Sequence, residues 1–316
     1  MLVVKSIEDI VRCSTLSSLL EIAGWPKPGN VHRTRDFKDT RFEHFLAAVA
    51  VIQPNFLRFG ERIKKDSRIQ KNNLSYVHLG QFFKNAAKKM MEWQKGGNTI
   101  LGHLIILAPL VAAAIISLQN NTLKIKDFEK VLNNIIKDTT VKDTVDLYKA
   151  INLCKPGGLG KVPRYDLTNE NAIEEIQKDK ITLQQIFNIS QTYDLISSEY
   201  STGYNIILNE GLPYYFKIFN QTYDINTSTV HTFLYILTNH PDTLIIRKSG
   251  VNKAREISQN ASKILKVGGL TTKRGEKLLM EMDSALQSQE GKLNPGTTAD
   301  LIAGIIFCAL IFGLKF

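Results

Sequence analysis

The stretch TILGHLIILAPLVAAAIISL, from Thr99 to Leu118, is long enough to cross a membrane and contains no Asp, Glu, Lys or Arg. A second apolar run, LIAGIIFCALIFGLKF, occupies residues 301–316 and follows the polar sequence NPGTTAD. Neither run has a clear positively charged flank on one side only, as membrane helices usually do. Helices in the core of a large helical domain are also hydrophobic all round. We therefore expect residues 99–118 and 299–314 to form adjacent buried helices, with a membrane span as the alternative.

Helical spacing of apolar residues continues through the rest of the chain. Residues 7–23, IEDIVRCSTLSSLLEIA, place their apolar side chains near one face, and residues 41–65 repeat the pattern with a break expected at Pro54. Alternating β-branched runs around Asn-Gly or Asp-Gly turns are scarce. The sequence predicts an all-α fold, a single domain over residues 1–316, with loops rich in Gly, Pro and Asn between the helices.

The charge composition indicates which classes of binding partner the protein favours. The 316 residues include 40 Lys and Arg against 30 Asp and Glu, a net charge of +10, which favours anionic partners such as nucleotides, nucleic acid or membrane surfaces. The charges are spread along the chain and not gathered on one helix, which lowers the case for nucleic acid or a membrane surface.

The cysteines and the N-terminus indicate the compartment. Cys13, Cys154 and Cys308 are far apart and no C-x-x-C occurs, so neither a zinc ribbon nor a disulfide framework is indicated. The first residues lack the pattern of a signal peptide. We expect a cytoplasmic protein.

Two similar loops precede the two apolar helices. GGNT, residues 96–99, and NPGTTAD, residues 294–300, each place Asn and Thr beside Gly. Free N–H groups at a helix start bind anions, and glycine lets a phosphate approach the backbone. Each loop alone could be a plain helix cap. Two such loops in one chain favour a shared phosphate site.

Other motifs are weaker. Lys27 stands between two prolines in PKPGN, a rigid turn that suits contact with a phosphate, and Arg33, Arg35 and Asp36 follow. GGLGK, residues 157–161, fails the P-loop spacing and is interpreted as a flexible loop with a weak prospect of touching substrate.

The carboxylates and histidines form no recognisable metal or hydrolase motif. Asp143 and Asp146 have helical i,i+3 spacing, which more often marks a solvated face than a pocket. His103 lies on an apolar helix and is interpreted as a satisfied core residue. Mg²⁺ bound with a nucleotide needs only one or two protein carboxylates besides phosphate oxygens.

Five motifs together resemble the triphosphoribosyl-dephospho-CoA synthase family, in its archaeal-type branch. They are PKPGNV with RDF, KGGNTILG, HPDTLIIRKSG, MDSAL and LNPGTTADLIAG, in the order and approximate spacing of that family. The resemblance implies an all-α transferase that joins ATP to 3′-dephospho-CoA or a related acceptor. The 2′-hydroxyl of the acceptor would attack C1′ of the ATP ribose, and adenine would leave.

The chain departs from the bacterial pattern in two places. The histidine expected immediately before Asp36 is absent, and GGNTILG lacks a His and a Lys of the bacterial run. If those groups bind the acceptor or protonate adenine, the acceptor differs here.

The resemblance implies roles for particular residues. Asp36 and Glu199 are the catalytic carboxylates expected, and Asp242 and Asp300 are expected to face Mg²⁺, the only cofactor. Substrate and phosphate contacts are expected from Lys27, Asn30, Arg35, Asn98, Thr99, Thr243, Arg247, Asn294, Thr297 and Thr298. Eleven residues are expected to line one cleft: Lys27, Asn30, Asp36, Asn98, Thr99, Glu199, Asp242, Asn294, Thr297, Thr298 and Asp300.

Alternatives stay open at this stage. Another Mg-ATP-dependent transferase or kinase could use the same scaffold, and a protein that binds nucleic acid or a membrane surface is the third reading. The partners expected are ATP and dephospho-CoA or a similar acceptor, with no nucleic acid and no membrane span, and a homodimer is left open.

Overall fold

The computed structural model describes residues 3–160 and 162–316, and within them it contains helices and no strand. Lys161, the last residue of GGLGK, lies outside the described residues. The first half of the chain holds α1 Ile7–Ala23, α2 Phe42–Lys65, α3 Ser67–Gln70, η1 Leu74–Val77, α4 Leu79–Trp93, α5 Leu101–Gln119, α6 Ile125–Lys137 and α7 Val141–Cys154. The second half holds α8 Ala172–Lys178, α9 Leu183–Ser190, α10 Leu195–Thr202, the π-helix η2 Ile206–Gly211, α11 Leu212–Thr222, α12 Ile225–Asn239, α13 Thr243–Ser249, α14 Val251–Lys266, η3 Gly269–Thr271, α15 Lys273–Gln287 and α16 Gly296–Ile311. The all-α prediction is confirmed.

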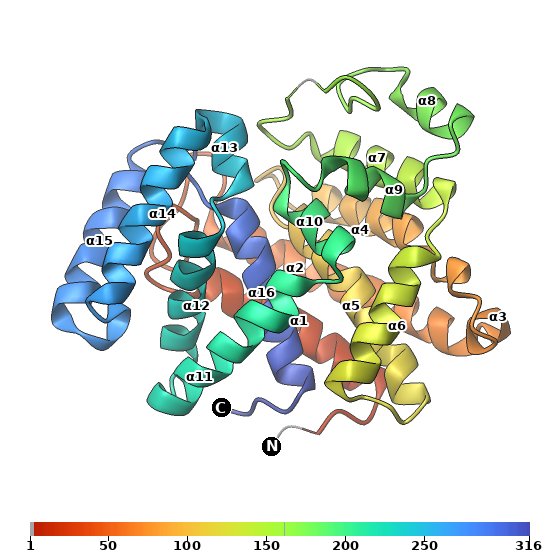
Figure 1. Cartoon of the computed structure of the whole chain (residues 1–316), viewed down its shortest axis with the longest axis horizontal. Helices are drawn as coiled ribbons and strands as arrows, with labels where there is room; N and C mark the ends of the chain where they lie inside the picture. The colour runs from red at the N-terminus through yellow and green to blue at the C-terminus, as the bar shows by residue number, and fades with distance from the viewer. Residues whose placement is uncertain (1–2, 161) are drawn as a thin grey trace.

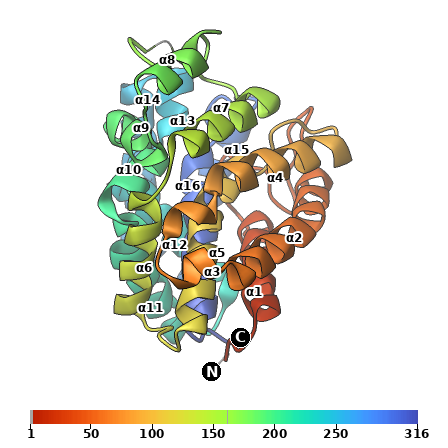
Figure 2. The same cartoon turned by 90° about the vertical axis from the view of Figure 1, so that its right-hand side faces the viewer.

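The two apolar runs form the centre of the molecule. Helices α5 and α16 contact each other, and nearly every side chain of both is buried. In Figures 1 and 2 the other helices surround this pair. Gly304 permits close packing, because a Cβ there would lie 2.7 Å from Ile207 and 2.8 Å from Ile106. The sequence prediction of adjacent buried helices is confirmed.

Only α5 is long and apolar enough to pass as a membrane span among the described residues. Its mean hydropathy is 2.4, and 89% of the window is buried inside the protein. Burial on all sides explains its composition, because a core helix has no solvent face on which polar residues would be favoured.

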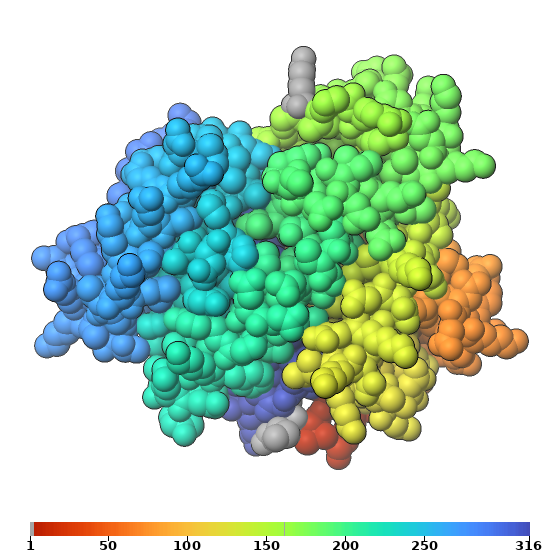
Figure 3. Space-filling model, in the orientation of Figure 1, coloured from red at the N-terminus to blue at the C-terminus, as the bar shows by residue number. Residues whose placement is uncertain are grey.

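The outer helices are amphipathic. In α6 the buried side chains are Phe128, Leu132, Ile135 and Ile136, which recur at the spacing of one helix face. In the space-filling view, α6, α9–α12 and α14 cover much of the face that is drawn, and α16 behind them is largely hidden (Figure 3).

The break expected at Pro54 is wrong. Helix α2 runs unbroken through this proline. A proline removes one backbone hydrogen bond and crowds the preceding turn. Here Val49, Ile52 and Phe56, on both sides of it, are buried in the core. Their packing outweighs the local penalty.

Candidate active site

A cavity of about 660 Å³ opens where the starts of α5 and α16 meet the loops of the second half. Its walls come from the end of α1, the loop before α2, helices α7, α9 and α10, helix α13, and the loop after α7. Eight residues predicted from the sequence line it: Lys27, Asn30, Asn98, Thr99, Arg247, Asn294, Thr297 and Asp300. The two similar loops, GGNT and NPGTTAD, therefore share one site.

The starts of α5 and α16 touch each other. A Cβ on Gly102 would lie 1.9 Å from Asp300 Oδ2, so only glycine leaves room for this carboxylate. Asn98 accepts a hydrogen bond from the Leu101 N–H at 3.2 Å and so caps α5. Local sequence thus shapes each helix start, and the packing of α5 on α16 brings both starts to the cavity.

A buried chain of charged groups leads from α1 to Asp300. Lys27 Nζ donates to the Glu21 side chain and, at 2.8 Å, to the Glu21 carbonyl. His103 Nε2 lies 3.3 Å from Glu21 Oε2 and 3.7 Å from Asp300 Oδ1, and its Nδ1 lies 3.2 Å from Ser18 Oγ. Burial alone would raise the pKa of Glu21, but Lys27 and His103 outweigh it and lower that pKa. Glu21 is therefore a carboxylate whose partners are already inside the protein.

Asp300 is different. Its side chain is 20% exposed, and no described residue donates a hydrogen bond to it; the Nε2 atom of His103 lies 3.7 Å from its Oδ1 atom. Burial, with the negative charges of Glu21, Asp242 and Asp194, raises the pKa of Asp300 well above its ordinary value. A carboxylate in this state favours a proton or a cation as partner.

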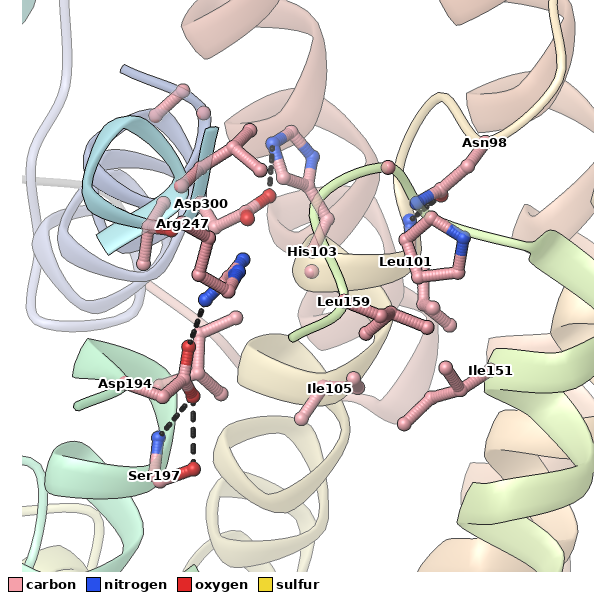
Figure 4. Close-up of a pocket in the computed structure, with 18 of the residues that line it drawn as sticks. Asn98, Leu101, His103, Ile105, Ile151, Leu159, Asp194, Ser197, Arg247 and Asp300 are labelled. Atoms are coloured by element: carbon pink, nitrogen blue, oxygen red, sulfur yellow. Dashed lines mark hydrogen bonds and ion pairs between the residues drawn. The ribbon is translucent and has the colours of Figure 1, made fainter. Parts of the chain in front are cut away.

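A second polar group lies on the same side of the cavity as Asp300, at the start of α10 and on α13. Asp194 caps α10 by accepting from the Ser197 N–H at 2.9 Å and hydroxyl at 2.8 Å, and it pairs with Arg247 at 2.9 Å. Lys248 donates to the Gly291 carbonyl and to Asn294. Figure 4 shows Asp300, Arg247 and Asp194 along one side of the cavity. Arg247 and Lys248 supply positive charge beside the start of α16.

The remainder of the cavity is apolar. Ile105 of α5 and Ile151 of α7 face it, and Leu159 reaches in from the loop after α7, away from the polar group in Figure 4. Side chains of α9 and α10, among them Ile189 and Ile196, complete this half.

Six predicted site residues do not line the cavity: Arg35, Asp36, Glu199, Asp242, Thr243 and Thr298. The prediction of one shared cleft is wrong for the four of these that it included, Asp36, Glu199, Asp242 and Thr298. Asp242 is fully buried, and its two oxygens accept from the N–H groups of Leu244, Ile245 and Thr298 and from the Thr298 hydroxyl. It caps α13 and holds it to the start of α16. Thr243 stands behind Thr297, to which it donates at 3.2 Å.

Glu199 is also a structural group. It is fully buried, and its two oxygens accept from the N–H groups of Ile206 and Ile207, both at 2.9 Å. Burial raises its pKa to about 8. Glu199 lies in α10 and points to the first residues of η2, and it does not line the cavity.

The expected pair Arg35 and Asp36 lies in an exposed loop. Asp36 accepts from the Phe42 N–H at 2.8 Å, and Arg35 pairs through its backbone with His32. Their neighbours Phe37 and Thr40 line the cavity in their place.

The sequence interpretation missed Glu21, Asp194 and Lys248 as cavity residues, and it took His103 for a core residue. His103 is indeed buried and hydrogen-bonded, yet it lines the cavity. The only local hint of these cavity residues was the spacing of Glu21 and Lys27, which lie six residues apart, so that their contact spans a turn. The approach of His103 to Glu21 and Asp300 has no local signal.

Among the described residues, no group of three His, Cys, Asp or Glu side chains could hold a metal ion alone. An Mg²⁺ that arrives with a nucleotide needs fewer protein ligands, since phosphate oxygens and waters complete its shell. The unpartnered carboxylate of Asp300 fits that requirement, whereas Asp242 does not.

Fold and cavity together define, over the described residues, an all-α protein whose cavity has a charged half and an apolar half. Residues 7–315 match the CitG family, described as ATP:dephospho-CoA triphosphoribosyl transferase. The chain belongs to this family and is a transferase that moves a triphosphoribosyl group onto dephospho-CoA.

A solved structure supports the assignment of the fold. A protein of Archaeoglobus fulgidus, described as a candidate triphosphoribosyl-dephospho-CoA synthase, is 25% identical to this chain with a TM-score of 0.63. The match covers 85% of this chain and 100% of that one.

Proposed function

We propose that the cavity binds ATP by its triphosphate at the charged half, and that the 2′-hydroxyl of dephospho-CoA displaces adenine from the ATP ribose there. The C1′–N bond to adenine breaks, a C1′–O2′ bond forms, the hydroxyl loses its proton and adenine gains one. The triphosphate stays on the product. The observation that carries this proposal is the unpartnered carboxylate of Asp300 between His103 and the start of α16.

The triphosphate is assigned to the surroundings of the α16 start. Arg247 and Lys248 supply cations, and Asn294 and Thr297 supply polar side chains at a helix N-terminus that attracts anions. Asp194 holds Arg247 by a 2.9 Å ion pair, which fixes the guanidinium near the cavity. Lys27 takes no part, because Glu21 already holds its ammonium group.

Asp300 supplies negative charge where positive charge develops on the ribose. Asp300 would also hold Mg²⁺ together with phosphate oxygens, and the ion would offset the charge of the triphosphate. His103, held between Ser18 and Glu21, is the neighbouring group that can exchange a proton, so we assign it the proton of the attacking hydroxyl.

Incubation with ATP, Mg²⁺ and dephospho-CoA tests the reaction. Mass analysis should find free adenine and a product that carries the triphosphoribosyl group, in equal amounts. Formation of ADP without adenine would indicate a kinase on the same scaffold and would contradict the proposal.

The compartment and the partners of the enzyme are inferred from its cysteines and its charge distribution. We infer a cytoplasmic enzyme, which the three buried free cysteines Cys13, Cys154 and Cys308 support. No nucleic-acid partner is proposed, because the basic residues are spread along the chain. Whether two chains associate stays a prediction that light scattering would test.

A further inference from the structure

The apolar half of the cavity continues as a strip to the protein surface. The strip consists of Leu101, Ile105, Ile151, Leu159, Ile189 and Tyr193, all of which line the cavity. At its outer end Leu159, Ile189 and Tyr193 are 37%, 47% and 44% exposed. Large apolar side chains exposed together at the mouth of a cavity indicate a ligand that covers them.

The strip carries no charged side chain. The cations that line the cavity among the described residues mostly have carboxylate partners: Lys27 is held by Glu21, Arg164 by Asp179 at 2.7 Å and Arg247 by Asp194 at 2.9 Å, and Lys248 donates to Gly291 and Asn294. An uncharged group therefore suits the strip best, since most of these cations already have partners and the six side chains of the strip are uncharged.

Two polar groups beside the strip are already engaged, whereas the buried Thr99 hydroxyl, which also lines the cavity, has no hydrogen-bond partner among the described residues. The Tyr148 hydroxyl donates to the Tyr165 carbonyl at 2.6 Å, and the Ser190 hydroxyl donates to the Ser197 hydroxyl at 2.8 Å. An aminopurine needs partners for its ring nitrogens and amino group, and burial without them is unfavourable. The Thr99 hydroxyl alone offers fewer partners than the ring nitrogens and amino group of an adenine need, so the strip suits an aliphatic chain better.

We propose that the strip binds the pantetheine arm of the acceptor, with Leu159 covering it from the loop after α7. The inference rests on the proposed function. The arm is uncharged, long and flexible, and its methyl and methylene groups match a strip of aliphatic side chains. Its amides can stay hydrated, because the outer end of the strip is open. The charged half is left for the triphosphate of ATP.

The loop is placed for this role. A Cβ on Gly158, whose φ is +78°, would lie 3.2 Å from Lys248 and 3.4 Å from Arg247. The loop backbone thus rests on α13 and crosses from the apolar half to the charged half. Glycine permits both the positive φ and the close approach.

The test uses the double variant Leu159→Ser with Ile189→Ser and two acceptors. ADP-ribose keeps the adenosine hydroxyls and the diphosphate of dephospho-CoA but replaces pantetheine by a polar sugar. The wild type should prefer dephospho-CoA in kcat/KM. The double variant should reduce this preference about 10-fold, the scale of lost apolar contacts in a pocket, and leave the KM for ATP unchanged.

The matched control is Ile125→Ser with Leu153→Ser, which are 43% and 45% exposed and do not line the cavity. It should keep the wild-type preference, and thermal unfolding should show both double variants folded. An unchanged preference in the Leu159/Ile189 variant overturns the proposal. A raised KM for ATP also overturns it, because the strip would then hold adenine.

Failure of the proposed function can be distinguished from failure of the strip proposal. If the wild type releases no adenine with either acceptor, the reaction is wrong. Equilibrium titration of the same variants with dephospho-CoA then tests the strip proposal without the reaction. Weaker binding only in the Leu159/Ile189 variant supports the proposal, and equal binding refutes it.

Discussion

At the residue scale, the acids in and around the cavity differ by how many of their oxygens are already occupied. Glu21 is held by Lys27 and His103, and Asp194 by Ser197 and Arg247. Asp300 accepts no hydrogen bond from the described residues and faces the cavity. A buried charge without partners is unfavourable, so its persistence at this position is explained best by a ligand that supplies the partner.

Replacing Asp300 by Asn tests this directly. The variant should bind Mg·ATP at least about 10-fold more weakly, a loss on the scale of a missing metal-site partner, while metal-free ATP binds equally or more tightly. Calorimetric titrations with Mg²⁺ and with chelator measure both. Its stability at neutral pH should not fall, since burial disfavours the charged form of Asp300. An equal loss of ATP affinity in both titrations, or no loss in either, would show that Asp300 does not bind the metal ion. Glu256→Gln, on the surface, is the control.

Glu199 predicts a pH dependence of stability. Its folded pKa is raised to about 8 by burial, so the folded state holds the proton more tightly than the unfolded chain does. This contribution is fully present below the unfolded pKa and is lost as pH rises to about 8, by about 1.4 kcal/mol per pH unit. Urea unfolding from pH 5 to pH 9 should therefore show a steeper decline for the wild type than for Glu199→Gln.

The variant should start less stable at pH 5, because an amide offers one acceptor to the two N–H groups of Ile206 and Ile207. Parallel pH profiles for the two proteins would show that Glu199 does not titrate in this range.

At the scale of elements, the site depends on the contact between two helix starts. Gly102 on α5 gives room to Asp300 on α16. Asp242, at the start of α13, accepts from Thr298 and so ties a third helix start to the same place. The loops between them bring chemistry to the cavity only because these three helices converge.

Gly102→Ala should destabilise the protein, although the same change stabilises most helices by about 0.5–1 kcal/mol. The added Cβ would fall 1.9 Å from Asp300 Oδ2 and force one helix start to move. In the Asp300→Ala background the carboxylate is gone, and the change should become neutral or favourable. Urea unfolding of the four proteins of this double-mutant cycle measures the coupling. If the changes in unfolding free energy simply add, the Cβ at position 102 does not clash with the Asp300 carboxylate.

At the scale of the whole molecule, one hydrophobic core runs through both halves of the chain. The α5–α16 pair contacts α1, α2, α4 and α6 of the first half and α10, α11, α12 and α13 of the second half. A continuous core of this kind favours cooperative unfolding.

The prediction of a single domain can be tested by unfolding with two probes. Trp25 and Trp93 report from the first half, while far-UV circular dichroism reports from all helices. Coincident urea transitions, in a protein purified without detergent, are expected. Two separate transitions would indicate that the chain consists of more than one domain.

The sequence by itself determined the helices, the burial of α5 and α16, and the gathering of Asn, Thr and Asp at their starts. These features are local: apolar periodicity and capping act within a few residues along the chain. The family motifs are local in the same sense, which is why Asn98, Thr297 and Asp300 could be named in advance.

Only the tertiary structure decided which polar groups keep a free face. Asp242 and Glu199 look as suitable as Asp300 in the sequence, yet backbone N–H groups occupy their oxygens. His103 became a cavity residue through contacts with Glu21 and Asp300, far away along the chain. The physical reason is that the partners of a buried polar group are set by the packing of helices distant in sequence, and no local pattern encodes that packing.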